Sequence, residues 1–390
     1  MLIWQSHCRK MPKILHVNSY YITNKLHGEL VSKLDEYGWQ QYVFLPVSSN
    51  NEIGINEVKG LKSTIFVYKK AFNTLSRLIW PVKMWLIYKA FKQIILRYLN
   101  PEIIHAHSLI VNGLIAFRYF NKTKTPYVVT LRNTDINIFL SKSFIFRRIG
   151  EKILNHSSAV LFLSPAYRDI QLKNNISSGI FKAILPKTHI IPNGINDFWF
   201  DNIAKEPNKL TESVVRIIFS GKLRENKNLK GLIEACERLN SNEIVVSLDI
   251  VGEGPLKSYL SNLKTTTKIK LHGFISEKKQ LASIYKSCHI MVVPSFRESF
   301  GLIYAEGMSQ GLPAIYTKGQ GFDGFFKDGE IGYAVDPYDT VDIAEKIKKV
   351  IENYDELSQN SLEKVKLFSW SNSVTSLNDI YLKAILSNKT

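Results

Sequence analysis

The chain has 390 residues, of which 45% are hydrophobic, which predicts two or three domains with full apolar cores and excludes a disordered chain. The formal net charge is +17, and nearly all of it falls in residues 1–200, which hold 26 Lys and Arg against 10 Asp and Glu. An excess confined to one half indicates an anionic partner for that half, namely phospholipid, nucleic acid or a phosphorylated substrate.

The first half begins with residues 1–10, which have no apolar core of signal-peptide length and which we interpret as an upstream start or a loose tail. Short apolar runs then predict strands, and stretches with helical spacing lie between them. The first of these helices is predicted to stop at Gly38. The alternation predicts a parallel sheet with crossover helices. The predicted strands are KILHVNSYY, QYVFLPV, IIHAH, PYVVTLR and AVLFLS.

The same pattern restarts in the second half, after a turn at HIIPNGIND and a polar stretch, residues 201–213, that we interpret as the linker. Two α/β units in tandem predict a ligand cleft between them, at the carboxyl ends of the strands. No stretch in either half approaches about 18 apolar residues, so no transmembrane helix is expected. The strands predicted here are VVRIIFSGKL, VVSLDIVGEG, KIKLHGF, HIMVVPS, PAIYT and YAVDP, and one helix is predicted from about Glu277 to Ser287.

The segment VVPSFRESFGLIYAEGMSQGLPAIYT carries the clearest chemical pattern. A strand runs into a loop at Glu298, and a helix is predicted from about Leu302 to Gln310. Gly311 and Pro313 end that helix. The N–H groups at its start form an anion site suited to a diphosphate, and Glu306, among apolar residues, leans toward that site, where ribose hydroxyls would be its partners. Alternatively, Glu298 only complements the helix dipole and Glu306 is exposed.

This segment resembles the signature of the family-four retaining glycosyltransferases. In that signature two glutamates have seven residues between them, and the first precedes a small residue, an aromatic residue and glycine. The resemblance implies that the second glutamate binds the donor ribose. It also implies that the first glutamate and the following loop amides hold the donor sugar and the leaving diphosphate. The matching donor residues are Glu298, Ser299, Phe300, Gly301, Leu302 and Glu306.

The resemblance extends from Lys13 to the closing FSWSNSVTSLNDIYLKAI and implies an α/β fold of two Rossmann-like domains, with parallel sheets that face a central cleft (GT-B). Residues 1–198 would form the acceptor-binding domain and residues 199–369 the donor-binding domain. A helix in residues 370–390, which follows Trp370, would cross back to the first domain.

Two further segments of the second half match the family. FSGKLRENKNLKGLIEA resembles the strand and loop whose two cations bind the diphosphate, which would be Lys222 and Lys227 here. Lys222 stands where Arg is usual, so it keeps the charge and loses the bidentate fork. Taken alone, the lysines also fit a solvated basic loop. IVGEGPL resembles the glycine turn beside the nucleotide, at Gly252, Glu253 and Gly254, although a lone pair of such glycines is usually a simple turn.

The first half departs from the family pattern. The first strand leads into Ser19, Tyr20 and Tyr21 where the family has a glycine-rich loop, so Tyr20 becomes a candidate for the cleft. PEIIHAHS resembles a strand end that places His107 near the cleft, where the alternative is a structural histidine. In TPYVVTLRNTD, Arg132 stands where many members carry His, with Asp135 three residues on. Arg132 would contact a donor or acceptor phosphate, or else would form a salt bridge that closes the loop.

Residues 80–98 have apolar side chains at helical spacing with basic residues between them. One interpretation is a membrane-facing basic helix with aromatic anchors. The other is a crossover helix packed on the sheet with its lysines in solvent, and both hold if its faces differ. The basic residues in and before this stretch are Lys69, Lys70, Arg77, Lys83, Lys89, Lys92 and Arg97.

We therefore expect a cytoplasmic retaining glycosyltransferase of bacterial type that transfers a hexose from a nucleotide-diphosphate sugar, with UDP as the expected nucleotide. Its catalytic residues would be Glu298, Lys227 and Arg132. Cations and amides would stabilise the leaving diphosphate with no metal and no other cofactor, since no Asp-x-Asp motif ends a strand. Charge asymmetry and family analogy predict a glycan acceptor on a lipid carrier, in capsule or O-antigen synthesis at the inner face of the cell membrane, and no nucleic acid.

Two other hypotheses stay open. One is a sugar-nucleotide epimerase or a phosphorylase of the same architecture, although a phosphorylase would need a lysine-bound pyridoxal cofactor that nothing in the sequence signals. A non-enzymatic basic protein that binds membrane or nucleic acid would explain the charge but not the two glutamates. The three cysteines, Cys8, Cys236 and Cys288, are far apart and lack metal-ligand spacing, which fits free thiols in a reducing compartment.

Overall fold

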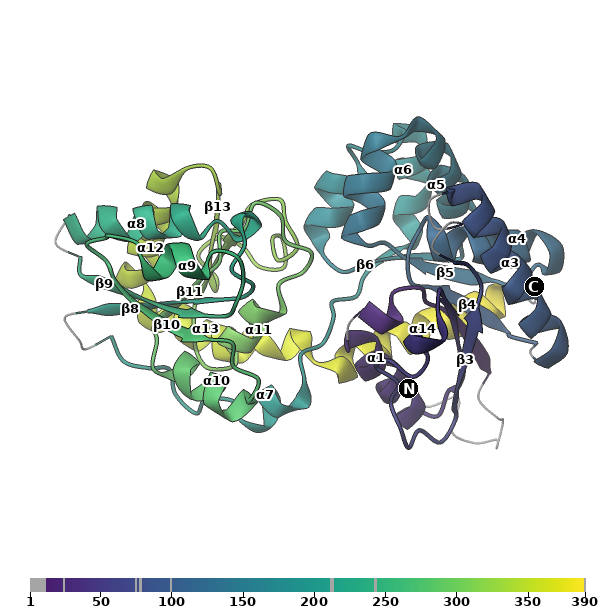
Figure 1. The fold of residues 1–390 in the computed structure, drawn as a ribbon, viewed down its shortest axis with the longest axis horizontal. Helices are drawn as coiled ribbons and strands as arrows, with labels where there is room; N and C mark the ends of the chain where they lie inside the picture. The colour runs from purple at the N-terminus through teal and green to yellow at the C-terminus, as the bar shows by residue number, and fades with distance from the viewer. Residues whose placement is uncertain are drawn as a thin grey trace. The chain divides into compact units, whose positions relative to one another are not determined.

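The computed structural model describes residues 12–388 apart from residues 24, 74–75, 77–78, 99, 211–213 and 242–243. Residues 1–10 and Arg77 thus lie outside the described residues, as do the side chains of Arg97 and Tyr98. The chain divides into two compact units (Figure 1). Unit 1 comprises Met1–Leu163, Gln171–Ile191 and Trp370–Thr390, and unit 2 comprises Ser164–Ile170 and Pro192–Ser369.

The division differs from the expected boundary after residue 198, because the chain enters unit 2 directly after Ile191. Residues 201–213 were expected as the linker, yet their described part belongs to unit 2. The reason is that this polar stretch bonds to the unit: the Ala204 N–H donates to Ser309 O at 2.9 Å. A short earlier segment, Ser164–Ile170, also belongs to unit 2, and no sequence pattern indicated this excursion.

In the described residues of unit 1, seven parallel strands form one sheet in the order β3-β2-β1-β4-β5-β6-β7. The chain starts at β1, builds outward to β3, and returns to the other side of β1 with β4. Side chains at the carboxyl ends of β1 and β4 therefore meet where parallel α/β sheets usually bind ligands. The strands are β1 Lys13–Val17, β2 Gln40–Val47, β3 Thr64–Lys70, β4 Ile103–Ala106, β5 Tyr127–Thr130, β6 Ala159–Phe162 and β7 Thr188–Ile190.

Helices cover both faces of this sheet (Figure 1). Helix α14, from the end of the chain, packs with α1 on one face, where its apolar side chains join a core that includes Ile14 and Trp39. The Trp39 indole N–H donates to Asn378 on α14 at 3.2 Å. The helices are α1 Leu26–Glu36, α3 Trp80–Tyr98, α4 Val111–Thr123, α5 Phe144–His156, α6 Ser178–Ile184 and α14 Trp370–Ser387, with the π-helical segment η3 Asp135–Leu140. A second π-helical segment, η4 Tyr167–Leu172, begins in unit 2 and ends in unit 1.

The described part of unit 2 contains six parallel strands in the order β10-β9-β8-β11-β12-β13. The helix predicted from about Glu277 to Ser287 is α10, and Glu277 caps it by accepting from Lys279 N. The strands are β8 Val215–Ser220, β9 Val246–Val251, β10 Lys268–Gly273, β11 Ile290–Val292, β12 Ala314–Thr317 and β13 Gly332–Val335. The helices are α7 Asp197–Asp201, η6 Glu225–Lys227, α8 Leu229–Ser241, α9 Lys257–Ser261, α10 Lys278–Lys286, α11 Leu302–Met308, α12 Thr340–Glu352, α13 Tyr354–Lys364 and η7 Val365–Phe368.

A sequence that alternates buried strands with amphipathic helices folds this way because parallel strands need helical connections, which then cover the sheet faces. Within the described residues, no helix is both long enough and apolar enough to cross a lipid bilayer.

Candidate active site

The loop between β11 and α11 is shaped by a glycine. Gly301 takes a left-handed conformation, with φ of 84°, directly before the helix, and a Cβ at this position would overlap the ring of Tyr304. Tyr304 is itself fixed, because its hydroxyl donates to Val293 O at 2.7 Å. The loop therefore turns sharply at the carboxyl end of β11, as the sequence predicted, and α11 begins at Leu302.

The backbone of Glu298 is held from three sides. Its N–H donates to the side-chain oxygen of Gln320 at 3.2 Å, and its carbonyl oxygen accepts from Gly321 N at 3.1 Å and from the Tyr167 hydroxyl at 2.9 Å. Gln320 and Gly321 lie in the loop after β12, whereas Tyr167 lies in the Ser164–Ile170 segment. Tyr167 was not predicted, because no motif surrounds it.

Lys227 and Glu298 come from different motifs, and the fold brings them together. Lys227 Nζ lies 2.5 Å from Glu298 Oε2, and the two side chains are only 19% and 13% exposed. The other carboxylate oxygen of Glu298 accepts from Ser299 N at 3.0 Å. Asn226 joins the two loops, because its side-chain amide donates to Arg297 O at 2.9 Å. A shielded cation thus lies at the helix start where an anionic leaving group was expected.

A cavity of about 510 Å³ adjoins this pair. Gly221 lines it, and Lys227 Cε lies 3.9 Å from the position that a Cβ on Gly221 would take. The backbone at Gly252 lies so close to Gly221 that only glycine fits there. Gly252 has φ of 139°, and a Cβ at this position would overlap Gly221 O. Residues predicted from sequence that line the cavity are Lys222, Gly252, Glu253, Gly254 and Glu306, and residues missed include Arg224, Phe274, Ile275 and Ile303.

Glu306 lies on α11 at the wall of this cavity. Burial raises its pKa to about 7, and the nearby Trp199 indole and Lys278 oppose the rise. The Trp199 N–H is buried and makes no hydrogen bond of ordinary geometry with any described group. A carboxylate in this setting lacks its hydration shell and is suited to accept hydroxyl donors from a ligand.

Three other residues of the predicted donor site make contacts within the protein or leave the cavity wall to a neighbour. Phe300 is 4% exposed and packs against Phe325 and Phe368, so its side chain is part of the core and only its backbone faces the loop. Leu302 begins α11, but the neighbouring Ile303 is the side chain that lines the cavity. The carboxylate of Glu253 pairs with Lys257 Nζ at 2.8 Å on the exposed surface.

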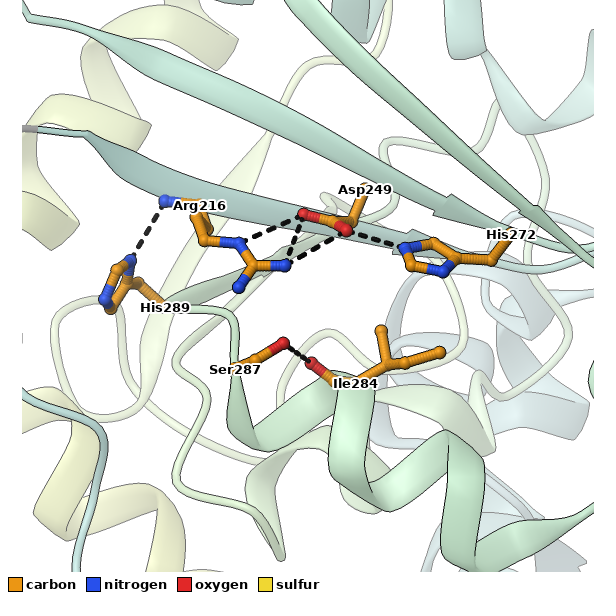
Figure 2. Close-up of polar contacts among 6 residues, drawn as sticks. All are labelled: Arg216, Asp249, His272, Ile284, Ser287 and His289. Carbon is orange, nitrogen blue, oxygen red and sulfur yellow. Dashed lines mark hydrogen bonds and ion pairs between the residues drawn. The ribbon is translucent and has the colours of Figure 1, made fainter.

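A buried charge network supports the strands next to the cavity (Figure 2). Asp249 on β9 is 4% exposed and accepts from two nitrogens of Arg216 on β8 at 3.1 to 3.3 Å. His272 Nε2, on β10, lies 2.6 Å from the same carboxylate. These contacts tie β8, β9 and β10 together just before the glycine turn at Gly252, so they fix the frame on which that turn is built.

In unit 1, His107 belongs to a cluster of buried histidines that sequence reasoning did not assemble. Gln41 donates its amide to Val31 O and Thr64 Oγ1, so its oxygen accepts from His16 Nε2 at 3.1 Å. A neutral His16 then accepts at Nδ1 from His107 Nε2, at 2.9 Å. The hydrogen-bond chain therefore leaves His107 Nδ1 as a lone-pair acceptor, and this buried atom has no partner among the described residues.

The cluster extends to His27 on α1 and to His105, whose ring stacks on His107 with centroids 3.9 Å apart. The ring nitrogens of His105 bond to Thr130 Oγ1 at 2.7 Å and to the Tyr381 hydroxyl at 2.6 Å. Burial lowers the pKa of His16 to about 4, and it lowers the pKa values of the other three histidines well below their ordinary range.

Ligand atoms of His16, His105 and His107 lie within 4.8 Å of one another, close enough to be considered as metal ligands. Hydrogen bonds within the protein engage every ring nitrogen of the three except His107 Nδ1. The nearby Arg132 adds positive charge, and no carboxylate belongs to the group. We therefore interpret these histidines as a neutral hydrogen-bonded core.

Asp135 has a different role from the one expected. Its buried carboxylate accepts from Leu109 N at 2.9 Å, from Ile110 N at 3.1 Å and from Arg132 N at 2.9 Å. These bonds lower its pKa, although burial dominates and raises it. The alternative of an Arg132–Asp135 salt bridge is not seen among the described residues, and backbone N–H groups that bond to the carboxylate instead close the loop and anchor the start of α4. Such a fully engaged carboxylate holds the scaffold.

The guanidinium of Arg132 turns to His107 instead, where its Nε donates to the backbone oxygen at 3.1 Å. Burial lowers the pKa of Arg132 to about 10. Tyr20 lies in the same group: burial raises the pKa of its hydroxyl, Asp135 raises it further, and Thr134 and Arg132 lower it. The predicted residues Tyr20, His107, Arg132 and Asp135 therefore gather at the carboxyl edge of the unit 1 sheet.

Comparisons with known proteins agree with this geometry. The family model described as Glycosyltransferase Family 4 matches residues 28–197, and that described as Glycosyl transferases group 1 matches residues 201–366. An uncharacterized glycosyltransferase of Methanocaldococcus jannaschii is 27% identical over 95% of this chain and 97% of its own length.

Two solved structures share the fold. Sucrose-phosphate synthase from Thermosynechococcus elongatus has a TM-score of 0.73 at 18% identity, over 96% of this chain and 100% of its own. HepE of Anabaena, in complex with UDP and glucose, has a TM-score of 0.65 at 16% identity, over 94% of this chain and 98% of its own. With two Rossmann-like units, the donor signature in place and family models matched across both halves, the chain belongs to the family-four glycosyltransferases of the GT-B fold.

Proposed function

We propose that this glycosyltransferase transfers a hexose from a nucleotide-diphosphate sugar with retention of anomeric configuration and without a metal ion. The observation that carries the proposal is the shielded pair of Lys227 and Glu298 beside the cavity of Glu306. An ammonium group next to the first N–H groups of a helix is suited to a developing diphosphate charge. Without a donor, Glu298 is the counterion of Lys227, and an incoming diphosphate would take that place.

The cavity suits the nucleotide part of the donor. Glu306 would accept hydrogen bonds from the ribose hydroxyls, while Lys222 and Arg224 supply positive charge for the diphosphate. Phe274, whose side chain is 73% exposed at the same cavity, offers an aromatic face to a base. UDP is the nucleotide we propose, because the HepE structure of similar fold was solved with UDP and glucose.

The chemical step would break the bond between the anomeric carbon and the diphosphate oxygen, with an oxocarbenium-like transition state. The acceptor hydroxyl attacks from the same face, and its proton passes to the departing diphosphate oxygen, so no metal and no further reactant is required. Lys227 lowers the energy of the diphosphate anion. Glu298, released from Lys227, would accept a hydroxyl of the donor sugar, and Arg132 would contact the acceptor or the donor phosphate.

We propose a glycan on a lipid carrier as the acceptor, which places the enzyme in capsule or O-antigen synthesis at the inner face of the cell membrane. The support for this is the basic excess of unit 1, whose residues 58–150 contain 16 Lys and Arg and only two acidic residues, Glu102 and Asp135. A lipid diphosphate carrier is anionic, so it would be attracted to such a surface.

A screen of nucleotides and nucleotide-sugars for thermal stabilisation tests the donor. A UDP-sugar at 100 times its dissociation constant should raise the unfolding free energy by about 2.7 kcal/mol, whereas ADP and GDP forms should raise it less. The matched variants are Glu306→Ala, which should lose the response, and Glu234→Ala on the exposed side of α8, which should keep it. Absence of stabilisation by every nucleotide would exclude this cavity as the donor site.

The reaction class needs its own measurement. Proton NMR of the product should show the same anomeric configuration as in the donor, and turnover should persist in EDTA. A product of inverted configuration would contradict retention. Loss of turnover in EDTA, with recovery on addition of magnesium or manganese, would contradict metal independence.

A further inference from the structure

Large apolar side chains lie exposed at one part of unit 1. On and before α3, Ile79 and Trp85 are each 57% exposed, and on α5, Phe144 and Ile145 are 66% and 68% exposed. The π-helical segment η3 adds Ile138 at 50%. Scattered apolar side chains are normal on a protein surface, so a special role for these requires that they form one surface.

Ring contacts join the two helix starts. The Trp80 ring, at the first residue of α3, meets Phe146 in the first turn of α5 with centroids 4.8 Å apart. Phe139 of η3 meets the same Phe146 ring at 5.0 Å. These contacts bring the starts of α3 and α5 together with η3, and we call the exposed apolar side chains on and next to these elements the apolar ledge. It consists of Ile79, Val82, Trp85, Ile138, Phe144 and Ile145.

Cations surround the apolar ledge. Arg148 lies over the ring of Phe144 with its Cζ 5.1 Å from the centroid, and Lys89 Nζ lies 5.3 Å from the centroid of Trp85. The two acidic residues in the surrounding 58–150 region do not oppose these charges at the ledge: Asp135 is buried, and Glu102 accepts from Lys13 N. Exposed apolar side chains with basic residues around them are suited to an anionic lipid surface.

Topology places the apolar ledge near the predicted acceptor residues. In a parallel α/β sheet, the helix that follows a strand begins at the carboxyl edge of the sheet. Helices α3 and α5 follow β3 and β5, so the ledge residues at the starts of these helices lie at that edge. Segment η3 begins at Asp135, only three residues after Arg132. The ledge and the Arg132 group therefore share one edge of the unit 1 sheet.

The structure also corrects the simple form of the sequence prediction, in which residues 69–97 formed the membrane contact. Helix α3 packs into unit 1 with Met84, Ile87, Phe91, Ile94 and Ile95, all of which are buried. Its opposite face carries the exposed side chains of Val82 and Trp85, so the packed interpretation is confirmed for one face and the membrane-facing interpretation stays a prediction for the other. The strongest anchors, Phe144 and Ile145, belong to a segment that the sequence did not single out.

We propose that the apolar ledge inserts into the interfacial region of an anionic bilayer and docks unit 1 with its carboxyl edge toward the membrane. Each basic residue near such a surface contributes about 1 kcal/mol, and salt weakens that attraction, whereas the apolar anchors give a salt-resistant part. Docking can be measured without turnover, so its test is independent of the proposed sugar transfer.

The experiment is co-sedimentation of the full chain with vesicles of phosphatidylcholine, alone or mixed with phosphatidylglycerol, at low and high salt. The wild type should bind the mixed vesicles and lose most of this binding in high salt. The double variant F144S/I145S should bind roughly tenfold more weakly or worse. Its matched control is Y37S/L185S, which removes two exposed large side chains that precede β2 and β7, at the opposite edge of the unit 1 sheet, and should bind like wild type.

Two charge-reversal variants test whether binding depends on the lysines near the apolar ledge or on the overall positive charge of unit 1. Changing Lys83 and Lys89 to Glu should weaken binding far more than changing Lys122 and Lys124 to Glu, because the latter two lie at the carboxyl end of α4, away from the ledge. Brominated lipid should quench the fluorescence of Trp85, which is measured as the difference in fluorescence between wild type and W85F. The proposal is overturned by equal binding of F144S/I145S and wild type, by an absence of vesicle binding at low salt, or by self-association or RNA binding through the ledge in place of vesicle binding.

Discussion

The two units use the carboxyl edges of their sheets in opposite ways. In unit 2 the edge is kept open: glycines let β8 and β9 approach closely, and a cavity of about 510 Å³ lies beside them. In unit 1 the corresponding edge is filled by side chains that bond to one another, among them His16, His105 and His107. The cavity at the edge of the unit 2 sheet depends on the backbone conformation of glycines, whereas the cluster at the edge of the unit 1 sheet depends on side chains from several strands.

This difference affects how each unit should respond to protons. The unit 1 cluster is buried and neutral, so protonation opposes its folded state. In unit 2, Glu306 is a partly buried acid whose pKa is raised by burial, so deprotonation is the unfavourable event there. The two edges should therefore show opposite pH dependence.

The largest predicted effect is acid lability of unit 1. The pKa of His16 falls from 6.5 when unfolded to about 4 when folded, so stability is complete above pH 6.5 and is lost as the pH falls toward 4. His16 alone contributes on the order of 3 kcal/mol to this loss. Hydrogen exchange followed by peptide should show unit 1 opening before unit 2 as the pH falls.

Two variants sharpen that test. His16→Gln keeps hydrogen-bonding capacity without a titrating proton and should reduce the pH dependence, whereas His156→Gln, on the exposed end of α5, should leave it unchanged. Simultaneous opening of both units at the same pH would show that the histidine cluster is not the acid-sensitive element.

The second prediction concerns the shielded cation of unit 2. Lys227→Ala should lower turnover by roughly 100-fold or more, because a charge partner of the leaving diphosphate is lost. Lys230→Ala removes a neighbouring lysine that pairs with Glu225 at 3.2 Å on the surface, and it should stay near wild-type turnover. Lys222→Arg should be tolerated or slightly faster. Full turnover by Lys227→Ala would place the diphosphate elsewhere.

The third prediction separates binding from stability at Glu306. Its pKa of about 7 means that donor affinity should rise as the pH increases through 7, when the carboxylate forms. Glu306→Gln should weaken nucleotide binding roughly tenfold and remove its pH dependence. Because a raised pKa costs folded-state stability above that pKa, the variant should be more stable at pH 8 by up to about 3 kcal/mol. Calorimetry and thermal unfolding check the two parts, and unchanged affinity would exclude the ribose contact.

The smallest predicted effect tests the Ser164–Ile170 segment. Tyr167→Phe removes one donor to the carbonyl oxygen of Glu298 and keeps the ring, which should cost about 1 kcal/mol of loop positioning. We expect turnover to fall several-fold with an unchanged KM for the donor. Tyr259→Phe, on the exposed side of α9, is the matched control. A change in KM with no change in turnover would assign Tyr167 to donor binding instead.

The site at the open edge of the unit 2 sheet was predicted from sequence better than the side-chain cluster at the filled edge of the unit 1 sheet. The Glu298 loop, the glycine turn at Gly252 and the cations Lys222 and Lys227 each stand in a short contiguous pattern, because backbone turns need specific residues at fixed spacing. Arg224, in the same loop as Lys222, and Phe274, which follows β10, were missed although they line the same cavity. The assembly of a cavity depends on how loops meet, which periodicity does not encode.

Most side-chain contacts at the filled edge of the unit 1 sheet were not predicted from the sequence. His107 and Arg132 were placed near it by resemblance, but the sequence left open whether Arg132 contacts a phosphate or pairs with Asp135, and it did not indicate that three backbone N–H groups engage that carboxylate. His16 and Tyr381 were not considered, since a buried histidine in a strand and a tyrosine in a helix look like ordinary core residues. The contacts of His16 join residues 25 and 91 positions apart, and the contact of Tyr381 joins residues 276 positions apart, which no local pattern reveals.

Helix α14 carries a consequence for the order in which the protein is made. Tyr381 bonds to His105 across 276 positions of sequence, and Trp370, Val374 and Leu377 complete the core around Ile14. A ribosome releases the rest of unit 1 long before these residues emerge. Unit 1 must therefore wait, with one sheet face uncovered, while all of unit 2 is synthesised and becomes free to fold. In vectorial synthesis the second unit of this chain finishes first, and a nascent chain cut short before residue 370 would carry that exposed face to a chaperone.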